Sequence, residues 1–148
     1  FSRAGEEIDA ARAAGISVEI ISGITTAQGA AASLGIALTN RDSARRLQYV
    51  TGHDHKGGLP QDIDWQALAD KNATTVIYMP KKTLAALSRK VQEFGLPAHM
   101  PALAIMDATL STQRVISGTI AELPSLLTEA QMEGAVLVII GEVTKKFE

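Results

Sequence analysis

Apolar positions along the chain follow two periods, and these periods predict helices alternating with strands. Leu84, Leu87, Val91 and Phe94 have helical spacing, and Gly95 is a typical residue just past a helix end. Alternating or β-branched runs predict strands at residues 17–21, 46–51, 74–79, 102–108 and 113–117. Residues 135–141 are apolar on both faces of a strand, which favours a central, buried position in a sheet.

The segments between these strands complete an α/β pattern. Helices are predicted at residues 5–14, 26–34, 65–71 and 124–131. Only a short polar turn separates residues 102–108 from residues 113–117, so these two strands should form an antiparallel hairpin. We therefore predict a layered α/β domain with a mixed sheet of about five strands flanked by helices.

One predicted helix carries almost no large side chains. It lies within the segment ISGITTAQGAAASLGIALTNRD, residues 21–42, in which Thr25 and Gln28 have the spacing of a capping box. A well-capped helix that packs tightly against a neighbouring helix or subunit explains these residues. The hydroxyls of Thr25 and Thr26, with the N–H groups of the helix start, also suit a polar group of a ligand. The sequence leaves both interpretations open.

Composition narrows the class of protein. The chain has 148 residues, a formal net charge of −2 and 46% hydrophobic residues, which is typical of a globular domain. No acidic or basic excess supports binding to nucleic acid or to a membrane surface. Cysteine is absent, which excludes disulfides and thiolate metal sites and fits a cytoplasmic protein. The longest apolar run, residues 135–140, is too short to span a bilayer.

Few residues offer recognisable chemistry by themselves. His53, Asp54 and His55 are metal-ligand types, but no further ligand stands at a familiar spacing, so a solvated loop is favoured. The chain lacks a phosphate-loop pattern, a Gly-x-Gly-x-x-Gly fingerprint and a Gly-x-Ser-x-Gly nucleophile elbow. Arg41 fits either a solvated turn or a two-pronged grip on a carboxylate. Met79 fits either a core position or a contact with a planar ring.

Six sequence blocks follow one another along the chain. They read SRAGEE, ISGITTAQGAAASLGIALTNRD, VTGHDHKGG, VIYMPKKTL, AIMDATLSTQRVISGT and LVIIGEV. This series resembles the uroporphyrinogen-III C-methyltransferases, which are tetrapyrrole methylases that also occur as the methylase part of sirohaem synthase. The resemblance extends from Phe1 to about Val143.

The resemblance implies a fold of two α/β domains with S-adenosylmethionine in the cleft between them and S-adenosylhomocysteine as the product. It carries cofactor-binding roles to Thr25, Thr26, Met79, Ala108 and Thr109. Ala108 stands where the family has a glycine, and its methyl group would either crowd a ligand or be harmless at a negative φ. Arg41 matches an arginine that reaches substrate carboxylates in related enzymes.

The resemblance also implies a reaction and partners. The parent enzyme would methylate uroporphyrinogen III to precorrin-2, in sirohaem and cobalamin biosynthesis, and would form a homodimer. Residues 1–148 match only its C-terminal domain, so we expect the N-terminal domain to be absent here and this chain alone to be inactive. No catalytic residue or metal ligand is assigned within the chain. Two alternatives stay open, namely methylation of another precorrin or related acceptor, and a dimerisation domain without catalysis.

Overall fold

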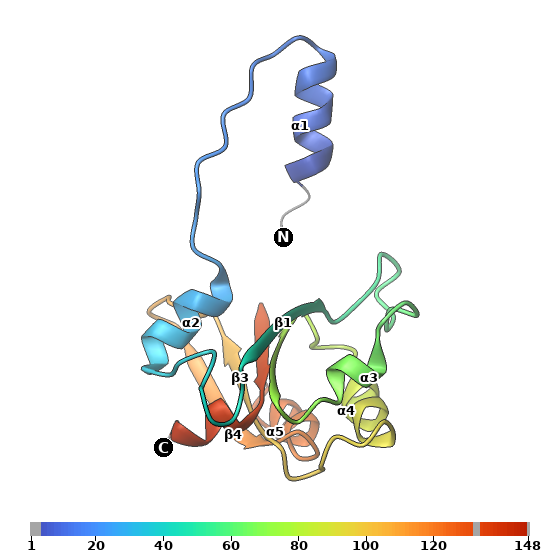
Figure 1. The fold of residues 1–148 in the computed structure, drawn as a ribbon, viewed down its shortest axis with the longest axis vertical. Coiled ribbons are helices and arrows are strands. Elements are labelled where there is room, and N and C mark those ends of the chain that lie inside the picture. The colour runs from blue at the N-terminus through green and yellow to red at the C-terminus, as the bar shows by residue number, and fades with distance from the viewer. Residues whose placement is uncertain (1–3, 132–133, 148) are drawn as a thin grey trace.

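A mixed sheet forms the centre of the computed structural model, which describes residues 4–131 and 134–147 (Figure 1). Its strands are β1 (Arg46–Thr51), β2 (Ala73–Tyr78), β3 (Pro101–Met106), β4 (Arg114–Thr119) and β5 (Val136–Ile140). They lie in the order β1-β2-β5-β3-β4. β1 pairs with β2 in parallel, and the other neighbours pair antiparallel. The predicted mixed α/β sheet is confirmed, with β5 at its centre.

Helices cover both faces of this sheet. They are α2 (Thr26–Leu34), α3 (Trp65–Leu68), α4 (Leu84–Glu93), α5 (Leu123–Glu129) and the 3-10 helix η1 (Glu142–Lys146). α2 packs on one face, against Val76, Leu103 and Ile139. The opposite face carries the larger apolar cluster, which includes Ile77 and Val138 and lies beneath α3, α4 and α5. Within the described ranges, no helix has the length and apolar character needed to cross a membrane.

The small-residue helix α2 begins where the capping box predicts. Thr25 Oγ1 accepts a hydrogen bond from the Gln28 N–H at 3.2 Å, and Gln28 Oε1 accepts one from the Thr25 N–H at 3.1 Å. Gly35, with a φ of 64°, ends the helix in the left-handed conformation that glycine favours. Ala27 and Ala30 are fully buried against the sheet. Because they present only methyl groups, the helix backbone lies close to the strands.

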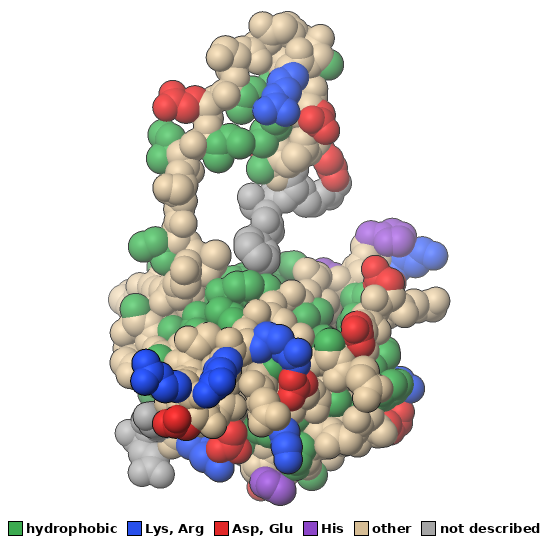
Figure 2. Space-filling model, viewed as in Figure 1, with side chains coloured by type: hydrophobic (Ala, Val, Ile, Leu, Met, Phe, Trp, Pro, Cys, Tyr) green, Lys and Arg blue, Asp and Glu red, His purple; other side chains and the backbone are tan. Residues whose placement is uncertain are grey.

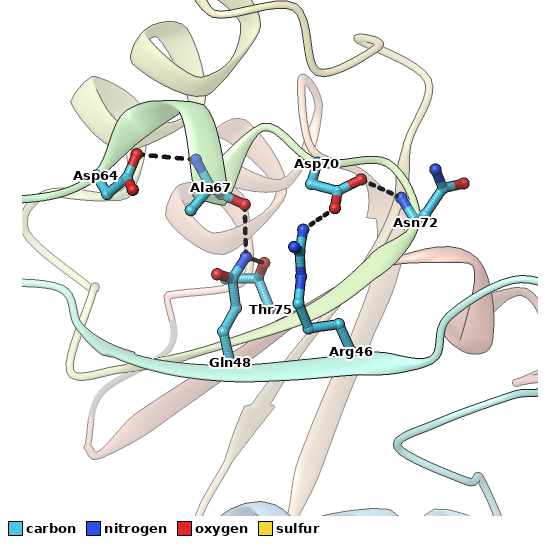
Figure 3. A network of polar contacts seen from close by, with 7 residues as sticks. All are labelled: Arg46, Gln48, Asp64, Ala67, Asp70, Asn72 and Thr75. Atoms are coloured by element: carbon cyan, nitrogen blue, oxygen red, sulfur yellow. Dashed lines mark hydrogen bonds and ion pairs between the residues drawn. The ribbon is translucent and has the colours of Figure 1, made fainter.

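Polar contacts fasten α3 to the edge strand β1 (Figure 3). Gln48 Nε2 donates to the Ala67 carbonyl at 2.9 Å and to Thr75 Oγ1 at 2.7 Å, which joins β1 to both α3 and β2. Arg46 forms an ion pair with Asp70 in the turn that follows α3. These contacts fix the second half of the long connection between β1 and β2.

An arm formed by α1 (Ala4–Ala13) and an extended segment stands away from the sheet (Figure 1). None of the α1 residues is buried. The strand predicted at residues 17–21 is wrong, because the segment pairs with no strand among the described residues, and Ile20 and Ile21 are 72% and 87% exposed. A strand needs a partner backbone, which β-propensity alone does not supply. The first two residues of the SRAGEE block lie outside the described residues.

Gly52 follows β1 at a point where the chain runs against the turn after β2. A Cβ atom at Gly52 would lie 2.7 Å from Pro80 Cα and 3.1 Å from Ile77 Cγ2. We expect Gly52→Ala to lower the free energy of unfolding by about 1–3 kcal/mol, because the backbone must move to admit the methyl group. Gly23→Ala is the matched control, since a Cβ atom at Gly23 meets nothing within 4 Å. Chemical denaturation measures both variants, and equal stability of the two would contradict the close contact.

Candidate functional site

Loops from all of the strands meet at one end of the sheet, which we call the carboxyl edge. β1 and β2 end there together, where Thr51 pairs with Tyr78. β3 ends beside the starts of β4 and β5, where Met106 pairs with Arg114 and Val136. This edge lies uppermost in Figure 1, below the arm, and Figure 2 shows apolar side chains gathered on the surface that faces the arm. Open α/β sheets bind ligands beyond the carboxyl ends of their strands.

The start of α2 lies at the carboxyl edge. A backbone N–H in its first turn donates to Tyr78 Oη, at the end of β2, over 3.3 Å. Gly29 lies so close to the β3–β4 turn that a Cβ atom there would be 2.9 Å from Thr109 Cγ2. The structure therefore brings Thr25 and Thr26 to the same edge as the end of β2 and the β3–β4 turn.

Two amide groups at the helix start already have acceptors within the chain. The Ala27 N–H donates to Tyr78 Oη, and the Gln28 N–H donates to Thr25 Oγ1. If N–H groups of the helix start hold a ligand, the Thr26 N–H is therefore the candidate. Thr26 is exposed.

Non-glycine residues with left-handed backbone conformations cluster on the loops of this edge. Met79 has a φ of 55°, Asp107 of 50° and Thr109 of 72°, and they are three of the four such residues in the described ranges. This conformation is strained for a residue with a side chain, and it persists where the surrounding structure holds it. Ala108 is not among these residues. Its backbone therefore does not require the glycine that the family has at this position.

The contacts around Met79 hold its backbone and leave its side chain exposed. His53 Nδ1 lies 3.1 Å from the Met79 carbonyl oxygen. A carbonyl only accepts, so this ring nitrogen carries the proton. The one hydroxyl proton of Thr83 is shared between the carbonyls of Gly52 and Pro80, which fixes the same turn. The Met79 side chain is 51% exposed, and a thioether in this setting suits contact with a planar ring.

One glutamine holds the β3–β4 turn against α2. Gln113 Oε1 accepts a hydrogen bond from the Thr109 N–H at 2.6 Å and another from Ser33 Oγ, on α2, at 3.1 Å. Inside the turn, Asp107 Oδ2 accepts from Thr112 Oγ1 at 3.1 Å. These bonds fix the turn beside the helix.

A hollow of about 310 Å³ opens beside Met79. Its lining, which is mostly apolar, consists of His53, Gly57, Met79, Lys81, Lys82, Gly134, Ala135 and Val136. The other predicted cofactor residues lie further along the carboxyl edge, on the side of α2. The hollow is wide enough for a flat ring system, and its rim carries hydrogen-bonding groups.

The loop after β1 has a shape set by its own polar side chains. The Asp54 carboxylate accepts hydrogen bonds from the Gly58 N–H at 2.9 Å and from the Lys56 N–H at 2.8 Å. These bonds lower the pKa of Asp54, with the Gly58 bond having the largest effect. No group of three or more His, Cys, Asp or Glu side chains in the described part of the chain is placed to hold a metal ion. Asp54 therefore shapes the loop.

Arg41 lies at the opposite end of the sheet from Met79. It precedes β1, whose first residue, Arg46, pairs with Ala73 at the start of β2. There Arg41 is exposed and lines a shallow hollow of about 220 Å³ together with Asn72. The structure thus gathers the predicted cofactor residues along one edge and leaves Arg41 at the other.

The sequence patterns do not single out Tyr78 or Gln113, and they present His53 only as a metal candidate. All three side chains hold the carboxyl edge through hydrogen bonds to α2, to Thr109 or to Met79. Their shared signal is position, because each is a polar residue within two residues of one end of a predicted strand. Strand ends that meet at one edge are where such residues come together.

Comparison with known proteins shows the family to which the chain belongs. A model of the tetrapyrrole (corrin/porphyrin) methylases matches residues 1–124. The chain is 43% identical over 145 residues to a siroheme synthase of Chromobacterium violaceum, covering 98% of this chain and 30% of that protein. It is 42% identical over 148 residues to the S-adenosyl-L-methionine-dependent uroporphyrinogen III methyltransferase, chloroplastic, of Arabidopsis thaliana, covering 98% and 39%. The chain thus spans 30–39% of the length of these relatives.

Solved structures share the fold. The uroporphyrin-III C-methyl transferase from Thermus thermophilus complexed with S-adenyl homocysteine matches with a TM-score of 0.78 at 27% identity, covering 99% of this chain and 63% of that chain. A cobalt precorrin-4 methyltransferase matches with a TM-score of 0.84 at 16% identity, covering 94% and 58%, which shows a common fold alone. Because the family model covers most of its length, the chain belongs to the tetrapyrrole (corrin/porphyrin) methylases.

Proposed function

We propose that the chain forms the C-terminal part of an S-adenosylmethionine-dependent methyltransferase that converts uroporphyrinogen III to precorrin-2. The observation that carries this proposal is the hollow beside Met79, at the edge where the predicted cofactor residues gather. The relatives named siroheme synthase and uroporphyrinogen III methyltransferase support the reaction. Their greater length supports a further, N-terminal domain in the complete protein.

The residues at the carboxyl edge fit S-adenosylmethionine. The apolar lining of the hollow and the exposed thioether of Met79 suit the flat adenine ring. The hydroxyls of Thr25 and Thr26 suit polar groups of the same ligand, and the turn at Ala108 and Thr109 offers backbone groups. The backbone at Ala108 lies outside the left-handed region, so alanine is compatible with this turn.

The reaction requires the protein mainly to align the methyl donor with the acceptor carbon. When bound, S-adenosylmethionine supplies a methyl group that leaves its sulfonium sulfur for an electron-rich ring carbon, which yields S-adenosylhomocysteine. The residues of this chain bind and orient the ligand and exclude water from one side of it. Hydrogen bonds to the backbones of Met79 and Thr109 hold these ligand-contacting loops in place before a ligand binds. We assign the base that removes the ring proton to the N-terminal domain.

Arg41 is proposed separately, as a contact for the acetate and propionate groups of the substrate. A guanidinium suits carboxylates because it donates two parallel hydrogen bonds. The position of Arg41 at the starts of β1 and β2 gives this role no support within the chain. The role therefore stays a prediction.

We propose that the arm packs against the N-terminal domain. Ile16, Ile20, Ile21 and Ile24 are between 60% and 87% exposed, and apolar side chains this exposed favour an interface. The β-propensity of residues 17–21 suits the edge of another sheet. Homodimerisation, which the family resemblance implies, is a further proposal, and light scattering separates monomer from dimer.

Turnover tests the proposed reaction. We expect a longer protein that contains this chain and its N-terminal domain to transfer radiolabelled methyl groups from S-adenosylmethionine to uroporphyrinogen III. The 148-residue chain alone should give no turnover above the blank, because one wall of the cleft and the base are assigned to the other domain. Turnover by the chain alone would contradict this division. An acceptor screen in which the longer protein methylates only a different precorrin would contradict the substrate.

Substitution of Met79 tests the hollow. We expect Met79→Ala to weaken S-adenosylhomocysteine binding by about threefold to tenfold, because a sulfur–ring contact is lost. Stability should change little, because the side chain is 51% exposed. Calorimetric titration and thermal unfolding measure the two effects.

The matched control for Met79 is Phe94→Ala. Phe94 is 43% exposed and lies at the far end of α4, where its ring centroid is 6.4 Å from that of Trp65. This variant should unfold at a lower temperature and bind S-adenosylhomocysteine as the wild type does. If Met79→Ala also bound the ligand like the wild type, the placement of the ring beside Met79 would be wrong.

A further inference from the structure

The β3–β4 turn is held by the side chain of Gln113, which is not among the predicted cofactor residues. Gln113 directly precedes β4 and is half-buried. Its Oε1 atom accepts hydrogen bonds from the Thr109 N–H at 2.6 Å and from Ser33 Oγ at 3.1 Å. This oxygen atom therefore links the turn to α2, across 80 residues of sequence, through the one hydroxyl proton of Ser33, which is shared with the Ala30 carbonyl at 2.9 Å.

The conformation of the turn depends on these hydrogen bonds. Thr109 and Asp107 have φ angles of 72° and 50°, and this conformation is costly above all for the β-branched Thr109. Thr109 is exposed, so burial does not hold it in place. Its methyl group instead lies against the bare backbone of α2, where a Cβ atom at Gly29 would be 2.9 Å away. Without the Gln113 acceptor, the Thr109 amide would turn to solvent and the turn would relax.

We propose that Gln113 is a positioning residue for the cofactor site. It fixes the β3–β4 turn against α2, so that the part of the site formed by Thr26, Ala108 and Thr109 has one geometry before a ligand binds. This inference rests on the proposed function, because the same residues are there assigned to S-adenosylmethionine. A site that is already ordered binds its ligand more tightly, since binding then requires less loss of conformational freedom.

Two variants distinguish the effect of the acceptor oxygen of Gln113 from the effect of its side-chain shape. Gln113→Met keeps the length of the side chain and removes the acceptor, whereas Gln113→Glu keeps an oxygen acceptor for both donors. Gln92→Met is the matched control. Gln92 is also half-buried and hydrogen-bonded, donating to the Ser88 carbonyl at 2.9 Å, but it lies in the last turn of α4, away from the carboxyl edge.

Amide hydrogen exchange tests the hydrogen bond from the Thr109 N–H to Gln113 without any ligand. The Thr109 N–H should be protected in the wild type, in Gln113→Glu and in Gln92→Met. In Gln113→Met it should exchange at least about tenfold faster, because the acceptor is gone. The measurement on the wild type needs no variant to fold. A Thr109 amide that exchanges freely in the wild type, or at equal rates in both Gln113 variants, overturns the proposal.

Calorimetric titration with S-adenosylhomocysteine tests the consequence for the site. Gln113→Met should bind about threefold to tenfold more weakly, as expected for the loss of a net hydrogen bond. Gln113→Glu should restore wild-type affinity, and Gln92→Met should keep it even if both methionine variants lose thermal stability. Faster exchange with unchanged affinity overturns the positioning role and leaves the proposed function standing. The titrated proteins contain both this chain and its N-terminal domain, because the proposed cleft is formed by both. A wild-type protein of this length that binds no S-adenosylhomocysteine contradicts the proposed function, and the positioning role with it.

Discussion

The close approach of α2 to the sheet is the constraint on which the candidate site depends. Ala27 and Ala30 are fully buried and present only methyl groups to the strands. Leucine side chains at these positions would push the helix outwards, because packing distance depends on the side chains at the contact. At the observed spacing the first turn of α2 reaches Tyr78, and the bare backbone at Gly29 reaches Thr109. The alanine-rich sequence therefore serves the packing and the site together.

The carboxyl edge is fixed from both sides before any ligand is present. On the side of β1, His53 holds the carbonyl of Met79, and on the side of α2, Gln113 holds the amide of Thr109. Both of the residues held in this way have left-handed backbones. Strain of this kind persists only where neighbouring groups maintain it, and it gathers where a protein binds ligands or reacts. Side chains at the ends of the strands are thus arranged to keep the edge rigid.

Local patterns predict most of the fold. The strand expected at residues 46–51 and the helix expected at residues 26–34 have the bounds of β1 and α2, because alternation and the capping box are local signals. The apolar run at residues 135–141 contains the central strand β5. The strand expected at residues 17–21 is wrong, because pairing depends on a distant backbone that the described chain does not provide.

The site depends more strongly on distant parts of the chain. The resemblance to a family selects Met79 and Thr109, but no local pattern shows that Gln113 reaches Ser33, 80 residues earlier. The same holds for Arg41, which follows α2 closely in sequence. Its place at the opposite edge follows from the parallel register of β1 and β2, which the sequence alone does not specify.

The central claim is that one ligand contacts both α2 and the loops after β2 and β3. Backbone NMR of a protein that contains this chain and its N-terminal domain, during titration with S-adenosylhomocysteine, tests this claim most directly. We expect the chemical-shift changes to concentrate at Thr25, Thr26, Met79, Ala108 and Thr109, with little change at residues 39–46. Changes centred on residues 39–46, or no change at any ligand concentration, would contradict the claim.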